Sequence, residues 1–121
     1  MGVSNLTYQK CMPCEGGEYV PMTPAEAEVV RVEHTPGWRL VPGLDDGTGM
    51  YLARSYNGMG SYKDAEAFII LVGVIAEEEY HHPDVEFGWG YAFVKIMTHA
   101  IEGLSINDFI LAAKIDERTG I

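Results

Sequence analysis

The stretch SYKDAEAFIILVGVIAEEEYHHP, from Ser61 to Pro83, decides the fold because it predicts the longest helix and the point where that helix stops. Ser61 is a good N-cap, so a helix is expected over residues 62–80. Pro83 disfavours helical geometry at the residue before it, which leaves His81 and His82 on the loop that follows the helix. Apolar side chains recur along the segment at helical spacing, at Ala65, Phe68, Val72, Ile75 and Tyr80.

Two further helices are predicted from their capping residues. Thr23 caps a first helix that begins at Pro24 and continues to about Val32, before the chain breaks at residues 34–37. Ser105 caps a last helix. Helical periodicity continues in this last helix at Phe109, Ala112, Ala113 and Asp116.

Extended segments lie between these helices and form two hairpins. Residues 38–41 and 50–56 flank the turn-rich segment PGLDDGTG, and residues 85–89 and 92–98 flank Gly90. Period-two alternation in the last of these strands places one set of side chains on each face. One face carries Val94, Ile96 and Thr98, and the other carries Phe93, Lys95 and Met97.

The resulting order is helix, two strands, helix, two strands, helix. Hairpin connections favour antiparallel pairing, so the expected fold is α+β, a four-stranded antiparallel sheet with the helices packed on one face. A chain of 121 residues is the right length for one domain. We therefore expect a single domain over residues 1–121, of which residues 1–22 form an N-terminal arm.

The composition excludes several classes of protein. Eighteen acidic and eight basic side chains give a formal charge of −10, which repels the nucleic-acid backbone. No apolar run reaches the roughly 18 residues of a membrane span, and the N-terminus has no signal-peptide pattern. We expect a cytoplasmic protein with no membrane partner and no direct nucleic-acid partner.

The candidate functional residues are three histidines and two carboxylates at the ends of regular elements. His81 and His82 follow the long helix, and His99 follows the last strand, whereas His34 lies in a turn without such company. Glu77 lies about one helical turn before His81. Asp108 lies in the first turn of the last helix, near the loop after His99. Side chains at such ends can converge on one cleft.

Two kinds of chemistry fit this cluster. Positioned imidazoles transfer protons near neutral pH, which suits the removal or addition of water without a metal. Zinc is the alternative, although zinc-binding histidines usually follow an HxH or HxxxH spacing and adjacent histidines tend to diverge. Nucleophilic catalysis is disfavoured because no GxSxG motif is present.

Cys11 and Cys14 form a CMPC motif in the N-terminal arm. This spacing occurs in zinc sites and in redox dithiols, but zinc needs two further ligands and a redox motif should follow a strand and open a helix. The alternative interpretation is an arm that packs against the domain.

The spaced residues resemble the pterin-4a-carbinolamine dehydratase family. The resemblance covers about residues 23–116 and includes TPAEAE, PGW, GWGY, THAIEGLS and NDFILAAKID. Its core is one pattern of fixed spacing, made of Glu77, His81, His82, Pro83, Trp89, His99 and Asp108.

This resemblance implies dehydration of 4a-hydroxytetrahydropterin to quinonoid dihydropterin, in tetrahydropterin recycling, with no metal or organic cofactor. It implies that His81 and His99 transfer protons and that His82 positions the pterin. The residues that bind substrate or support the histidines would then be Glu77, Trp89, Thr98 and Asp108. The family also implies a homodimer or homotetramer. A protein-association module on the same fold is the alternative function.

Overall fold

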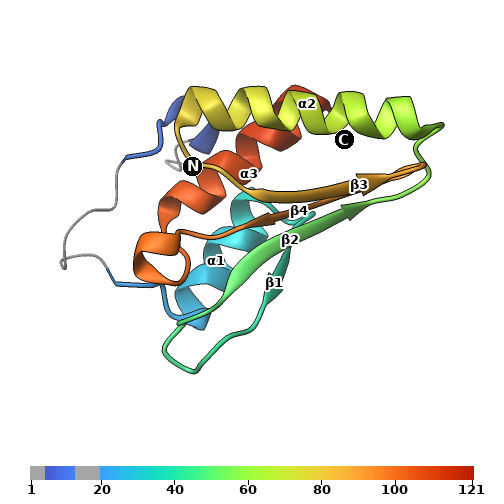
Figure 1. The fold of residues 1–121 in the computed structure, drawn as a ribbon. Coiled ribbons are helices and arrows are strands. Elements are labelled where there is room, and N and C mark those ends of the chain that lie inside the picture. Colours follow the sequence, from blue (N-terminus) through green and yellow to red (C-terminus); the bar gives the residue numbers. More distant parts are fainter. Residues whose placement is uncertain (1–4, 13–19) are drawn as a thin grey trace.

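The computed structural model describes residues 5–12 and 20–121 of the chain. Four strands form one antiparallel sheet in the order β1-β2-β4-β3, and the helices cover one face of it (Figure 1). The strands are β1 (Arg39–Val41), β2 (Tyr51–Tyr56), β3 (Asp84–Gly88) and β4 (Tyr91–Ile96). The predicted α+β class and the predicted element order are confirmed.

Three α-helices begin directly after the capping residues that the sequence indicated. They are α1 (Pro24–His34), α2 (Tyr62–Glu79) and α3 (Ile106–Thr119). Thr23 and Ser105 both form capping boxes, and the Ser61 side chain accepts a hydrogen bond from the backbone of Asp64. These caps satisfy backbone N–H groups that the first helical turn leaves without an intrahelical partner.

Two details of the helix ends differ from the expectation. Helix α1 continues two residues beyond Val32, so His34 is its last residue instead of part of a turn. The helix can continue because only Thr35, the residue before Pro36, must leave helical geometry. Tyr80 does not continue the apolar stripe of α2, because it adopts a left-handed conformation (φ 54°) and is 85% exposed.

The core lies between the helices and the covered face of the sheet. Leu52, Val94 and Ile96 are fully buried on that face. Helix α2 contributes the stripe Ala65, Phe68, Val72, Ile75 and Ala76, and α3 contributes Phe109, Ile110, Leu111, Ala112, Ala113 and Ile115. None of the helices in the described ranges is long and apolar enough to cross a membrane.

The described part of the N-terminal arm packs against this domain. It contains a short 3-10 helix, η1 (Leu6–Tyr8), which contacts α3. Leu6 is only 4% exposed and belongs to the hydrophobic core. Burial of this leucine side chain stabilises the docked arm by about 1.5–3 kcal/mol. The predicted packing of the arm is therefore observed for residues 5–12.

Candidate functional site

Antiparallel pairing of β3 with β4 brings the three candidate histidines to one end of the sheet. Asp84, the first residue of β3, pairs with Lys95 near the end of β4. His81 and His82 lie just before β3, and His99 lies just after β4 in the short helix η2 (His99–Ile101). Segments separated by two strands in sequence therefore meet at this end.

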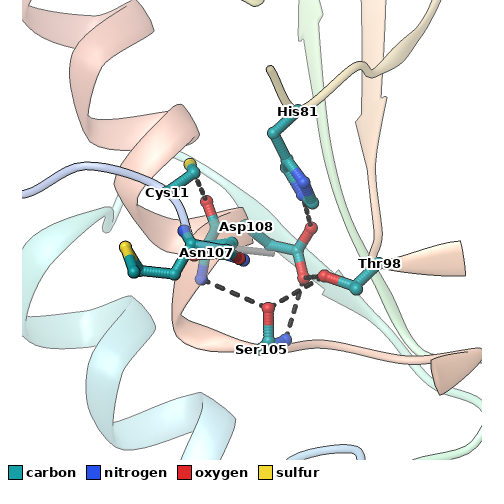
Figure 2. A network of polar contacts seen from close by, with 7 residues as sticks. Cys11, His81, Thr98, Ser105, Asn107 and Asp108 are labelled. Carbon is teal, nitrogen blue, oxygen red and sulfur yellow. Dashed lines mark hydrogen bonds and ion pairs between the residues drawn. The ribbon is translucent and has the colours of Figure 1, made fainter. Parts of the chain in front are cut away.

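Asp108 fixes the ring of His81. His81 Nε2 lies 2.7 Å from Asp108 Oδ1, and the Asp108 side chain is fully buried (Figure 2). The other carboxylate oxygen accepts from Thr98 Oγ1 at 2.8 Å and from the Ser105 backbone N–H at 2.9 Å. Because a carboxylate oxygen accepts, the hydrogen of His81 lies on Nε2, and Nδ1 remains for other contacts.

Glu77 contacts His82 on the solvent side of the same loop. His82 Nε2 lies 2.5 Å from Glu77 Oε2, and the two side chains are 51% and 74% exposed. The ring of Tyr80 meets the His82 ring edge-on, with 5.9 Å between the ring centroids. The predicted cluster therefore consists of two separate imidazole–carboxylate pairs, one buried and one exposed.

The three imidazoles share one cavity of about 420 Å³. His81, His82 and His99 all line it, together with Thr98. Within the described residues, the His99 ring makes no hydrogen bond to the protein, so both of its nitrogens can meet a ligand. The volume is in the range of small-molecule sites, and the imidazoles supply groups that accept or donate protons.

Residues 20–118 match the sequence profile of the family described as pterin 4 alpha carbinolamine dehydratase. The chain belongs to this family. The carbinolamine dehydratase profile thus covers all four strands and all but the last residue of the three α-helices, together with the three cavity histidines.

Curated carbinolamine dehydratase relatives are similar over nearly the whole chain. A protein of Methylococcus capsulatus is 44% identical over 117 residues, which cover 97% of this chain and 96% of the relative. A protein of Cupriavidus pinatubonensis is 46% identical over 112 residues, which cover 93% and 90% respectively. Both relatives carry provisional names as pterin-4-alpha-carbinolamine dehydratases.

Solved structures with the same fold are more distant in sequence. A transcriptional coactivator/pterin dehydratase of Brucella melitensis matches with a TM-score of 0.66 and 24% identity, over 80% of this chain and 96% of that one. A pterin dehydratase-like protein identified as a RuBisCO assembly factor of the alpha-carboxysome matches with a TM-score of 0.56 and 23% identity, over 72% and 94%. At this identity the likeness establishes the shared fold.

Neither Trp89 nor Glu77 lines the cavity, but Glu77 contacts the His82 ring, as a residue that supports an imidazole would. Trp89 is 71% exposed and lies in the turn between β3 and β4, at the opposite end of the hairpin from the histidines. Glu77 reaches the cavity only through His82. Thr98, in contrast, lines the cavity and donates to Asp108, as expected of a supporting residue.

Sequence reasoning missed part of the cavity wall. Cys11 and Met12 reach it from the N-terminal arm, Glu79 from the last turn of α2, and Asn107 from the first turn of α3. Glu79 was detectable, because it lies four residues after Ile75 on the buried stripe of the helix. No comparable signal marks Asn107.

Ionisable groups near the arm are perturbed by burial and by each other. Burial, followed by the nearby Glu79 carboxylate, raises the pKa of the Cys11 thiol to about 12. Burial opposes ionisation of Glu79, but hydrogen bonds from Lys114 and from the Cys11 backbone N–H outweigh it and lower the pKa of this carboxyl. The thiol therefore stays protonated near neutral pH, and Glu79 stays ionised.

The two metal hypotheses concern the histidines and the CMPC motif. Within residues 5–12 and 20–121, no group of three or more His, Cys, Asp or Glu side chains is arranged to hold a metal ion. Cys14 lies outside the described residues, so the pairing of Cys11 with Cys14 stays untested.

Proposed function

We propose that this chain dehydrates 4a-hydroxytetrahydropterin to quinonoid dihydropterin by acid/base catalysis of its histidines. The observation that carries the proposal is the cavity lined by His81, His82 and His99, in a chain of the carbinolamine dehydratase family. Its volume of about 420 Å³ accommodates a bicyclic heterocycle.

The reaction breaks the bond between C4a and its hydroxyl oxygen, and it needs two proton transfers. The departing oxygen takes one proton and leaves as water, while a ring nitrogen gives up another, so the protein ends with no net proton change. Asp108 holds the Nε2–H of His81, which leaves Nδ1 of that ring for one transfer. The His99 ring makes no hydrogen bond to the described residues, and it carries out the other proton transfer.

His82 has a different role in this proposal. Its ring is half exposed and its Nε2 is occupied by Glu77, so it positions the pterin at the cavity rim. Each group that transfers a proton contributes about 10²- to 10⁴-fold in rate. The reaction requires no metal or organic cofactor, and the setting proposed for it is tetrahydropterin recycling in the cytoplasm.

A stopped-flow assay with freshly generated 4a-hydroxytetrahydropterin tests the proposal. The protein is expected to accelerate dehydration equally before and after treatment with a chelator. His99→Ala should lose most of this acceleration, whereas His34→Ala, which alters a histidine outside the cavity, should retain it. Activity that disappears with the chelator would favour the metal alternative, and full activity in His99→Ala would remove that residue from the mechanism.

A protein-association role is the second candidate, and an apolar surface favours it. Ile70 and Val74 of α2 are 60% and 45% exposed, and Val85 on the edge strand β3 is 39% exposed. A groove of about 290 Å³ lies between this helix and this strand. Of the solved structures with this fold, one is described as a transcriptional coactivator and one as a RuBisCO assembly factor, and both descriptions imply action on other proteins.

Self-association into a homodimer or homotetramer through this surface is part of the proposal. Light scattering on the purified chain tests it, with Val74→Asp expected to reduce the oligomer mass. The double variant of His81 and His99 should keep the oligomer, since neither side chain belongs to the exposed apolar surface. A monomeric wild-type chain would reject self-association through this surface.

A further inference from the structure

Two residues of the N-terminal arm reach the histidine cavity, although they lie outside the segment that matches the family profile. That profile covers residues 20–118, whereas Cys11 and Met12 both line the cavity. Figure 2 shows Cys11 beside Asn107, close to the network of Asp108 and His81. A segment of the chain with no assigned role therefore borders the proposed reaction site.

Asn107 binds the arm through the backbone of Met12 at two points. The Met12 N–H donates to Asn107 Oδ1 at 2.9 Å, and Asn107 Nδ2 donates to the Met12 carbonyl oxygen. In addition, the Cys11 thiol donates to the Asn107 backbone oxygen at 3.4 Å. A side-chain amide that pairs with both the N–H and the carbonyl oxygen of one residue fixes the orientation of that residue's backbone, as a neighbouring strand would.

Glu79 provides a second attachment for the arm. Its Oε1 accepts from the Cys11 backbone N–H at 3.1 Å, and its Oε2 pairs with Lys114 Nζ at 2.5 Å. The Glu79 side chain is only 5% exposed. A buried carboxylate is stable here because both of its oxygens are satisfied, one by the arm and one by α3.

Both attachments lie next to the His81–Asp108 pair in the sequence. Glu79 precedes His81 by two residues at the end of α2, and Asn107 directly precedes Asp108 in the first turn of α3. The same two helix ends thus hold the imidazole–carboxylate pair and the arm. Because α2 and α3 pack together, the arm has one defined position relative to the cavity.

We propose that Cys11 and Met12 form a fixed wall of the ligand site, held there by Asn107 and Glu79 as positioning residues, and that this wall gives affinity for a flat aromatic heterocycle. The proposal deepens the proposed function and rests on it for the identity of the heterocycle. The cavity is lined by the sulfur-containing residues Cys11, Met12 and Met97 as well as by imidazoles. Polarisable sulfur makes favourable contacts with aromatic rings.

The wall acts in binding and has no part in proton transfer. Cys11 keeps its proton near neutral pH, since burial raises the pKa of its thiol to about 12. Met12 has no ionisable side chain. Detachment of the arm should therefore weaken ligand binding and raise KM while leaving kcat nearly unchanged, which separates this role from that of the histidines.

The experiment uses the full chain and 7,8-dihydrobiopterin, a stable dihydropterin, as the binding probe. Asn107→Ala removes both hydrogen bonds to Met12. Met12→Pro removes the donor N–H together with the Met12 thioether, and it lies outside the helices and the sheet, so it carries the test if Asn107→Ala fails to fold. Tyr8→Ala is the matched control, because Tyr8 is an 86% exposed side chain of the same arm that does not line the cavity.

Both test variants are expected to raise the Kd for the probe and the KM for the carbinolamine about tenfold, and to leave kcat within about threefold of the wild type. A tenfold change in Kd corresponds to the loss of about one or two hydrogen bonds that hold the arm. Tyr8→Ala should match the wild type. Hydrogen exchange adds a readout without turnover: the Cys11 and Met12 amides should exchange more slowly when the probe is bound, and this protection should be lost in Asn107→Ala.

Unchanged Kd and KM in both test variants would overturn the proposal that Cys11 and Met12 form a binding wall. A fall in kcat alone would also overturn it, because Asn107 would then act on Asp108. A wild-type chain that binds the probe but dehydrates no carbinolamine would reject the proposed function and leave the wall in place. A wild-type chain that binds no probe would reject both.

Discussion

His81 and His82 are neighbours in sequence, yet the fold places them in opposite environments. The His81 side chain is 13% exposed and bonds to a fully buried carboxylate, whereas His82 is 51% exposed and bonds to one that is 74% exposed. The same division holds for the end of α2, where Glu79 is buried with Lys114 and Glu77 faces solvent. The loop after α2 thus has an inner pair, His81 with Asp108, and an outer pair, His82 with Glu77.

The two pairs differ in how strongly the loss of one partner should destabilise the fold. An exposed ion pair typically contributes about 0–1 kcal/mol, because water and salt screen it and both side chains lose freedom. Removal of one partner from a buried pair costs about 3–5 kcal/mol, because the remaining polar groups are left unsatisfied. The inner pair should therefore dominate both stability and catalysis.

The largest effect is expected from Asp108→Ala. This change leaves three donors without their acceptor, namely the groups of His81, Thr98 and Ser105, and it removes a capping interaction from α3. The free energy of unfolding should fall by about 3–5 kcal/mol and kcat by about 10²-fold or more. Urea unfolding and stopped-flow dehydration measure the two effects. Asp84→Ala, at an exposed position that begins β3, is the control.

The second prediction compares His81→Ala with His82→Ala. The first should lower kcat by about 10²- to 10⁴-fold and also destabilise the fold, since Asp108 loses a donor. The second should mainly raise KM and leave stability within about 1 kcal/mol of the wild type. Equal losses of kcat in the two variants would contradict the division into an inner pair and an outer pair.

The sequence was sufficient to predict the arrangement of helices and strands. Caps at Thr23, Ser61 and Ser105 are local signals, and each lies where the structure uses it. Helix ends are harder to predict because they depend on one or two residues, as the extension of α1 to His34 shows. Periodicity alone assigns Tyr80 to the apolar stripe, because it cannot register a left-handed cap.

The candidate site was predictable in part. The convergence of His81, His82 and His99 was expected from their places at the ends of regular elements, and the partnership of His81 with Asp108 agrees with the expectation that Asp108 orients an imidazole. The placement of Trp89 in the site did not follow from geometry, and the structure puts that residue at the far end of the hairpin. The wall made by the arm depends on contacts 68 and 95 positions apart in sequence, which no local pattern encodes.

The third prediction concerns Glu79, the buried carboxylate beside the inner pair. Its pKa lies below the ordinary 4.5 in the folded chain, so ionised Glu79 stabilises the fold above pH 4.5 and this contribution is lost as the pH falls through the folded pKa. Glu79→Gln should lower stability at pH 7 by about 1–2 kcal/mol. The difference in the free energy of unfolding between this variant and the wild type should become smaller below pH 4.5, as measured by urea unfolding across the pH range. Glu78→Gln, at an exposed pair with Arg118, should show a smaller gap.

The smallest effect is expected from Glu77→Gln in the outer pair. The glutamine side chain would keep the size of the original and an oxygen that accepts from His82, and the site is open to water, so stability should change by less than about 1 kcal/mol and kcat by less than about threefold. Any remaining difference should shrink in 1 M salt, where the screening length is about 3 Å. The measurements are urea unfolding and dehydration rates at low and high salt. A loss of kcat as large as that of His81→Ala, and insensitive to salt, would place the Glu77–His82 pair inside the proton transfer and erase the distinction between the two neighbouring histidines.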